Sequence, residues 1–254
     1  MKTGIQVSSF KPVLTTKEEV KTAFEKIQAM GCRWVQLQWI DPSIPTEYIA
    51  EMMTKTCNKS VGVQDFFEII RQNKAYYMDL NGKTGGKWMC VSRIPERLKT
   101  RQGLDRYVQE LREFQKELDP LGQRLCFHPV SGDFAPIDGM DPVEYLLEAM
   151  SELAICADLY HIDRATGDTP AWLRRYAGRV CMVHFKDARD GVLVPPGQGD
   201  VDFSGIIPAC LETGVEYGFV EQEKWEGDPF QRIQEGLDWL NGQLSANIGA
   251  GSTS

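Results

Sequence analysis

Apolar residues along the chain recur in two alternating patterns. Short apolar runs, typical of buried strands, are each followed by a segment whose apolar residues lie three or four positions apart, which is typical of amphipathic helices. The expected strands span residues 3–10, 34–40, 60–67, 87–94, 124–130, 153–160, 180–185 and 217–223. The expected helices span residues 17–30, 46–57, 68–80, 104–118, 142–150, 170–176, 203–213 and 229–244.

Eight strand–helix units predict a closed barrel. The run from Val180 to Phe185 is apolar on both faces until His184, which favours a parallel strand covered on both sides. Eight units are the number that a (β/α)8 TIM barrel requires, and 254 residues suit one such domain. An open doubly wound sheet is the alternative, although its glycine-rich dinucleotide turn is missing. We therefore predict an α/β fold, a single-domain TIM barrel over residues 1–244, with a disordered tail at 245–254.

Net charge and cysteine usage limit the binding partners and the cellular compartment that we expect for this protein. The formal net charge of -8 repels phosphate backbones and anionic lipids, so we expect neither nucleic acid nor membrane as a partner. No apolar run approaches the roughly 20 residues of a membrane span, and no signal peptide is evident at the start. Seven cysteines without a CxxC pair indicate a reducing compartment. We therefore expect a cytoplasmic protein.

Ionisable residues gather where the later strands are expected to end. In TIM barrels the active site lies at the carboxyl ends of the strands. Buried carboxylates there need partners, and a divalent cation flanked by imidazole satisfies several at once. Nitrogen and oxygen donors without thiolate predict one divalent metal ion, Mn²⁺, Mg²⁺, Co²⁺ or Zn²⁺. The alternative is a set of structural histidines, a capping aspartate and surface ion pairs. The residues concerned are His128, His161, His184, Asp158, Glu221 and Glu223.

Four motifs around these residues resemble a known superfamily. The chain is similar, over about Gly4 to Leu240, to the xylose isomerase-like TIM barrels, and within them to the branch of sugar phosphate isomerases and epimerases. Hydroxypyruvate isomerase, the ketose 3-epimerases and inosose dehydratase belong to that branch. The motifs are Asp158-Leu159-Tyr160-His161, Val183-His184-Phe185-Lys186-Asp187, Gly197-Gln198-Gly199-Asp200-Val201-Asp202-Phe203 and Val220-Glu221-Gln222-Glu223.

The resemblance implies roles for individual residues. Asp158, His184 and Glu221 match three of the four metal ligands of that family. His161 matches the histidine that contacts substrate oxygens, and Lys186 with Asp187 matches the pair beside the metal histidine.

The fourth ligand departs from the family pattern. Where the epimerases have glutamate, this chain has His128, and Asp133 follows at a spacing seen in other branches. His128 can be a neutral metal ligand, but it cannot supply a second carboxylate base. The departure speaks against a ketose 3-epimerase and leaves His128 and Asp133 as rival ligands.

These roles together predict a sugar or sugar phosphate isomerase or epimerase. A proton would be abstracted next to a carbonyl, with the metal stabilising the enediolate. The runner-up is a dehydratase, a lyase in which hydroxide leaves instead. The candidate catalytic residues are Glu221, His161, Lys186 and Glu223, with His128 as a further proton carrier.

Aromatic and basic residues near strand ends are candidates for substrate binding. Trp39, Trp88 and Trp225 could stack on a sugar ring beside His161, although core packing is the commoner use of tryptophan. Arg189 could hold a phosphate or carboxylate, with simple exposure as the alternative.

Two further classes of function are open. One is DNA repair of the apurinic endonuclease type, which the acidic charge and the supply of only three histidines disfavour. The other is a non-catalytic sugar-binding barrel that regulates a partner. Barrels of this family often pair, so the resemblance is compatible with a homodimer.

Overall fold

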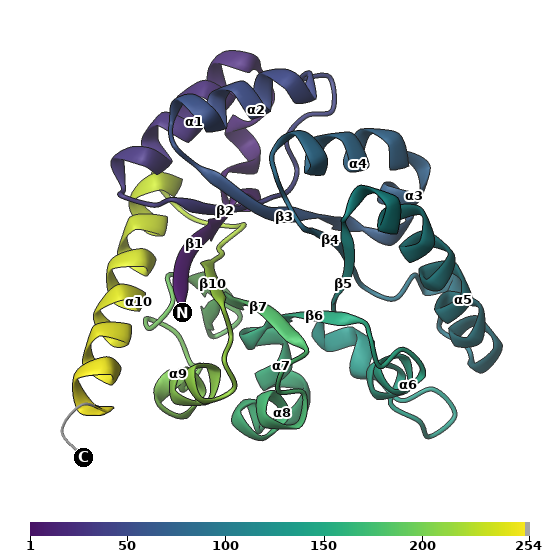
Figure 1. The fold of residues 1–254 in the computed structure, drawn as a ribbon. Helices are drawn as coiled ribbons and strands as arrows, with labels where there is room; N and C mark the ends of the chain where they lie inside the picture. The colour runs from purple at the N-terminus through teal and green to yellow at the C-terminus, as the bar shows by residue number, and fades with distance from the viewer. Residues whose placement is uncertain (252–254) are drawn as a thin grey trace.

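Eight parallel strands close into a barrel in a computed structural model, which describes residues 1–251 (Figure 1). The strand order around the barrel is β1-β10-β7-β6-β5-β4-β3-β2, and this confirms the predicted TIM barrel. The strands are β1 (Lys2–Gln6), β2 (Trp34–Leu37), β3 (Lys59–Phe66), β4 (Trp88–Ser92), β5 (Arg124–His128), β6 (Ala154–Asp158), β7 (Val180–Phe185) and β10 (Tyr217–Val220).

Helices surround this barrel (Figure 1) and bury their apolar stripes against it. In α5 the stripe predicted from the spacing, from Leu104 to Leu118, is buried, and the Thr100 side chain caps the first turn. The helices are α1 (Lys17–Ala29), α2 (Thr46–Lys55), α3 (Phe67–Gln72), α4 (Lys74–Lys83), α5 (Arg101–Leu118), α6 (Pro142–Ala149), α7 (Leu159–Thr166), α8 (Thr169–Arg175), α9 (Phe203–Glu212) and α10 (Pro229–Gly251). The 3-10 turns are η1 (Val7–Val13), η2 (Glu96–Leu98), η3 (Asp119–Leu121) and η4 (Ser131–Phe134).

Side chains fill the barrel interior in layers. One layer is apolar and contains Phe219, Met182 and three cysteines, Cys90, Cys126 and Cys156. Because strand side chains alternate, the next inward positions toward the carboxyl ends carry polar groups such as Gln36 and His184. The interior therefore changes from apolar to ionisable along the barrel axis.

Several predicted boundaries are wrong. Residues 7–10 belong to η1 rather than to the first strand, because an apolar run alone does not distinguish a buried strand from a buried turn. Five other strands end two to three residues early, and after Asp158 the chain enters α7 at once. The third helix is two helices, α3 and α4, with Asn73 between them.

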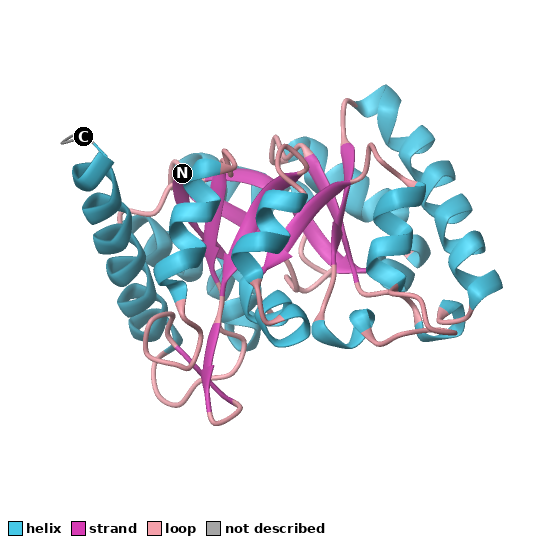
Figure 2. Ribbon diagram, turned by 90° about the horizontal axis from the view of Figure 1, so that it is seen from below, coloured by secondary structure: helices cyan, strands magenta, loops and turns pink. Residues whose placement is uncertain are grey.

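The proline- and glycine-rich segment after β7 contains a hairpin that the sequence reading missed. Strands β8 (Asp187–Arg189) and β9 (Val192–Val194) pair antiparallel and extend beyond one end of the barrel (Figure 2). Asp190 and Gly191 at its tip have φ of 51° and 78°. An Asp-Gly pair with two positive φ angles is the preferred tip of a tight hairpin, so the signal was present in the sequence.

The disorder predicted from Ser245 onward is wrong for residues 245–251, because α10 continues to Gly251. Hydrogen bonds from Ser245 Oγ to the Asn241 carbonyl and from Asn247 Nδ2 to the Gln243 carbonyl accompany this extension. Extending a formed helix costs less than starting one. The remaining predicted tail, residues 252–254, lies outside the described residues. None of the helices within residues 1–251 has both the length and the apolar character to cross a membrane.

Candidate metal and substrate site

A cavity of about 930 Å³ opens at the carboxyl ends of the strands. Its walls come from both halves of the chain, including Trp39 after β2, His128 on β5 and Glu221 after β10. Residues 191–195 of the hairpin segment also line it. The cavity has the size of a small-molecule site and the position at which TIM barrels carry out chemistry.

Four ionisable side chains converge at the base of this cavity. His128, Asp158, His184 and Glu221 each offer one ligand atom, and these atoms lie within 4.8 Å of one another. Three of them lie on the neighbouring strands β5, β6 and β7, and Glu221 directly follows β10, the next strand of the barrel. Asp158 pairs in register with His184. All four residues are buried. The predicted metal ligands are thus brought together, and they form a group that could hold a metal ion.

Two of the distances between candidate ligand atoms match those between neighbouring ligands of a single metal ion, and a third is longer. His184 Nδ1 lies 3.0 Å from Glu221 Oε2 and 3.2 Å from His128 Nε2. His128 Nε2 lies 3.8 Å from Asp158 Oδ2. Ligand atoms about 2.1 Å from a common ion stand roughly 3.0–3.4 Å apart in octahedral or tetrahedral sites.

The two oxygens of the Asp158 carboxylate have different surroundings, and one of them fits a divalent cation. Asp158 Oδ1 accepts the backbone N–H of His161 and so caps α7. Asp158 Oδ2 is buried, and within the described part of the chain it has no hydrogen-bond partner. A buried anionic oxygen is costly unless a cation or donor satisfies it, so the residues present fit a divalent ion.

The charged side chains of the group shift one another's pKa values. Burial raises the pKa of Glu221, but Lys186 and His184 outweigh it and hold this pKa well below its usual range. Burial lowers the pKa of His184, but the Glu221 carboxylate more than offsets it and the net shift is upward. Burial, with His184 nearby, lowers the pKa of His128 to about 4. His128 is therefore neutral near pH 7, as a metal ligand must be.

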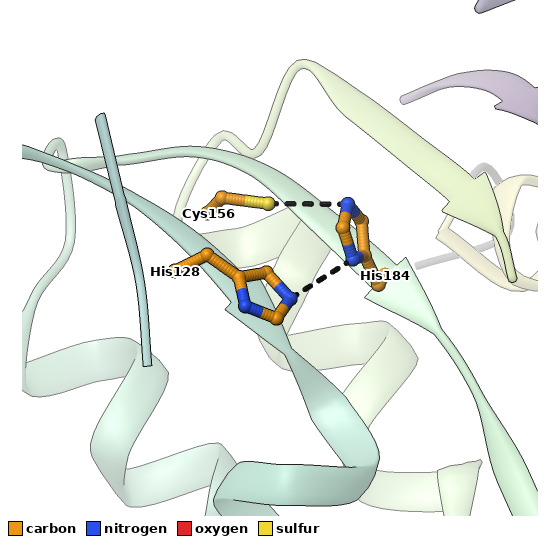
Figure 3. Close-up of side chains that lie close together, drawn as sticks. All are labelled: His128, Cys156 and His184. Carbon is orange, nitrogen blue, oxygen red and sulfur yellow. Dashed lines mark hydrogen bonds between the residues drawn. The ribbon is translucent and has the colours of Figure 1, made fainter. Parts of the chain in front are cut away.

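A thiol also touches the group. Cys156 Sγ lies 3.2 Å from His184 Nε2, whereas His128 approaches the other ring nitrogen (Figure 3). His128, Cys156 and His184 form a second set of potential ligands that shares both histidines with the first. The sequence reading assigned no thiolate to the site.

Three more predicted residues stand between the ligand group and the cavity. Lys186 Nζ lies 2.6 Å from Glu223 Oε2 and 3.9 Å from Asp158 Oδ2. Burial lowers the pKa of Lys186, but the carboxylates of Glu221, Asp158 and Glu223 raise it on balance. Lys186 therefore stays an ammonium ion and is unsuited to act as a base. The side chains of His161 and Glu223 are 19% and 22% exposed, and both line the cavity.

The structure separates His128 from its rival Asp133. Both Asp133 carboxylate oxygens accept backbone N–H groups, one from Ile94 and one from Val130, and Lys99 lies 3.5 Å away. Asp133 is therefore engaged in holding the loop after β5, and of these two residues only His128 belongs to the described group that could hold a metal ion.

Asp187 has a structural role that the resemblance did not indicate. Its carboxylate accepts the backbone N–H groups of Gly197, Gly199 and Val201. Instead of facing the cavity beside Lys186, it anchors the loop after the hairpin.

Two of the predicted substrate contacts are wrong. Trp88 begins β4 and lines a different cavity at the amino-terminal end of the barrel, with Trp34 and Tyr217. Arg189 is exposed on the hairpin and is absent from the described cavity lining. Trp39 and Trp225 do line the cavity, and Trp225 Nε1 donates to the Ser9 carbonyl.

Arg93 is a cavity residue that the sequence reading missed. It follows β4 directly with φ of 64°, and Trp39 after β2 has φ of 58°. Such left-handed conformations are costly for residues other than glycine and cluster at functional sites. Lys11 and Arg232 supply further positive charge to the lining.

With this geometry established, comparison with known proteins identifies the class. The family of xylose isomerase-like TIM barrels matches residues 77–243, and the chain belongs to this family, as the motifs predicted. The rhizopine catabolism protein MocC of Rhizobium meliloti is 27% identical over 145 residues, which cover 49% of this chain. The match spans only 43% of that relative.

Solved structures agree on the fold. A sugar phosphate isomerase/epimerase from Parabacteroides distasonis superposes with a TM-score of 0.78 at 15% identity, covering 94% of this chain and 93% of that one. The IOLI protein, solved with a bound zinc atom, gives a TM-score of 0.74 at 15% identity over 98% of both chains. Identities at this level show a shared fold and leave the reaction to be argued from the site.

Proposed function

We propose that this barrel is a metal-dependent isomerase or epimerase that moves a proton at the carbon beside a carbonyl of a sugar or other polyol-derived substrate. The observation that carries the proposal is the convergence of His128, Asp158, His184 and Glu221 below an open cavity. The isomerase/epimerase among the structural relatives supports the same class.

His128, Asp158, His184 and Glu221 would hold one divalent cation. A cation bound there would polarise a substrate carbonyl and stabilise the negative charge left when the neighbouring carbon loses a proton. Two imidazoles and two carboxylates suit Mn²⁺, Co²⁺ or Zn²⁺ better than Mg²⁺, which prefers oxygen. The zinc atom in the structurally similar IOLI protein fits this expectation.

Glu223 and His161 are the proposed proton carriers. Both side chains line the cavity, and neither belongs to the group of candidate metal ligands. Burial, together with the charge of Glu221, raises the pKa of Glu223, which makes its carboxylate a stronger base. Burial lowers the pKa of His161, so a neutral imidazole is available to accept a proton. The ammonium group of Lys186 then stabilises anionic oxygen atoms of the substrate.

Arg93 is proposed to bind an anionic group of the substrate. We expect Arg93→Met to raise KM for phosphorylated or carboxylated substrates about tenfold or more, the effect of losing one charge-assisted hydrogen bond, and to leave neutral sugars unaffected. Arg189→Met is the matched control and should change neither value, because Arg189 is outside the cavity lining. Equal KM effects of the two variants would contradict this role for Arg93.

Solvent exchange tests the reaction class. The Mn²⁺-loaded protein is incubated in D₂O with ketoses, inososes and their phosphates, and substrate deuterium is followed by mass spectrometry and proton NMR. We expect deuterium at the carbon beside the carbonyl, with Glu223→Gln slowing exchange by about 10²–10⁴-fold, the usual worth of a positioned base.

The position of the label distinguishes the possible products. Deuterium on the neighbouring carbon indicates isomerisation, inversion at the same carbon indicates epimerisation, and loss of water indicates the dehydratase. EDTA-treated protein is the control and should exchange nothing. Absence of exchange with every substrate, in protein shown to contain metal, would overturn the proposed reaction.

A further inference from the structure

A row of four buried glutamines crosses the barrel interior beside the ligand group. Gln6 Nε2 donates to Gln36 Oε1 at 3.2 Å, and Gln36 Nε2 donates to Gln64 Oε1 at 3.0 Å. Gln64 Nε2 in turn donates to Gln38 Oε1 at 3.2 Å. All four residues are at most 6% exposed. Buried amides are costly unless hydrogen-bonded, and each of these four side chains makes at least one hydrogen bond within the row.

The second member of the row, Gln36, contacts one of the candidate metal ligands, His184. Gln36 Oε1 lies 2.6 Å from His184 Nε2. A carbonyl oxygen only accepts hydrogen bonds, so Nε2 must carry the proton. His184 Nδ1 faces His128 and the Glu221 carboxylate, which also only accepts, so a cation held by Glu221 would take the place of the proton on Nδ1.

This hydrogen bond decides between two sets of ligands. The Cys156 thiol stands at Nε2 and His128 stands at Nδ1 (Figure 3). Gln36 keeps Nε2 protonated, whereas the Glu221 carboxylate stands at Nδ1. A ring nitrogen binds a cation only through a free lone pair, so a protonated Nε2 cannot join Cys156 in coordination. Soft thiolate sites favour thiophilic ions, whereas carboxylates favour harder ones.

We propose that Gln36 is a positioning residue that holds His184 as its Nε2–H form and thereby keeps Cys156 out of the metal's ligand set. The Gln36 amide thus selects between the two overlapping ligand sets without itself binding the cation. This inference rests on the metal site of the proposed function. Partners of this kind typically change metal affinity by about 10–100-fold.

Histidine NMR reads the protonation directly, since the chain has only three histidines. In the metal-free wild type, the ¹⁵N resonance of His184 Nε2 should be that of a protonated nitrogen, and it should remain so after Zn²⁺ loading while Nδ1 shifts. An unprotonated Nε2 in the wild type would overturn the inference, whether or not metal binds. A protonated Nε2 with no metal uptake would instead contradict the proposed function alone.

Titration with Cd²⁺ gives a second measurement. If Gln36 had only a structural role, its replacement should not change the cadmium absorption spectrum. When the wild type is titrated with Cd²⁺, we expect no thiolate-to-cadmium charge-transfer absorption from Cys156. Its spectrum should therefore match that of Cys156→Ser. Gln36→Leu removes the acceptor and should create such an absorption, and Gln36→Leu combined with Cys156→Ser should abolish it. The affinity of Gln36→Leu for Mn²⁺ should fall by about 10–100-fold.

Two controls separate this effect from damage to the barrel. Gln36→Glu keeps an acceptor at the same place and should behave as wild type in the cadmium titration. Gln38→Leu shortens the far end of the row, which does not touch His184, and should leave its spectrum unchanged. A cadmium absorption in the wild type that depends on Cys156 would overturn the inference. If Gln36→Leu fails to fold, the wild-type and Gln36→Glu data still decide it.

Discussion

Asp158→Asn is expected to abolish stoichiometric metal binding while leaving the barrel folded. The amide oxygen of asparagine can still accept the His161 backbone N–H and cap α7, so the structural role of Oδ1 is kept. The charge on Oδ2, which is buried without a hydrogen-bond partner in the described part of the chain, is lost. Lewis-acid stabilisation is worth several kcal/mol, so activity should fall at least about a hundredfold.

Metal content by mass spectrometry, on protein purified without chelator and again after EDTA treatment and reloading with Mn²⁺, checks this result. Wild type should hold about one ion per chain, as expected for one four-ligand site. Asp133→Asn is the matched control, because Asp133 is equally buried but holds backbone N–H groups outside the ligand group. Loss of metal in the control together with retention in Asp158→Asn would reverse the assignment of ligands.

The ligand group was predictable because its members end or directly follow apolar runs. Parallel barrel strands bring all their carboxyl ends to one rim, so His128, Asp158, His184 and Glu221 had to approach one another once eight units were recognised. The same rule explains the error at Trp88. This residue begins its strand instead of ending it, and it therefore lies at the opposite end of the barrel.

Other features depend on register and side-chain direction, which the sequence pattern does not specify. Gln6 and Gln36 meet because β1 and β2 pair with these two residues side by side, and His184 reaches them only across the closed interior. The polar residue Gln36 inside an apolar strand was a signal in the sequence, but its partner His184 lies 148 positions further along the chain. The exposed position of Arg189 likewise follows from the hairpin, whose Asp190-Gly191 tip was overlooked.

The Gly-x-Gly motif of the resemblance receives a structural explanation from Asp187. Its carboxylate accepts the Gly197 and Gly199 backbone N–H groups at 3.0 and 2.9 Å. A Cβ on Gly199 would stand 2.1 Å from Asp187 Oδ1, and Gly197 has φ of 84°, so both positions need glycine. The motif thus builds an anion-binding loop whose anion is a side chain of the same protein.

Asp187→Ala is therefore expected to be the most destabilising change near the cavity. It leaves the backbone N–H groups of Gly197, Gly199 and Val201 without an acceptor, at a cost of about 3 kcal/mol or a fall in Tm of roughly 6–12 °C. Thermal unfolding measures this loss, with exposed Glu113→Ala on α5 as the control and Asp187→Asn expected between the two. Because residues 191–195 line the cavity, KM should also rise while metal content stays at the wild-type level. Loss of metal with unchanged Tm would instead place Asp187 among the metal ligands.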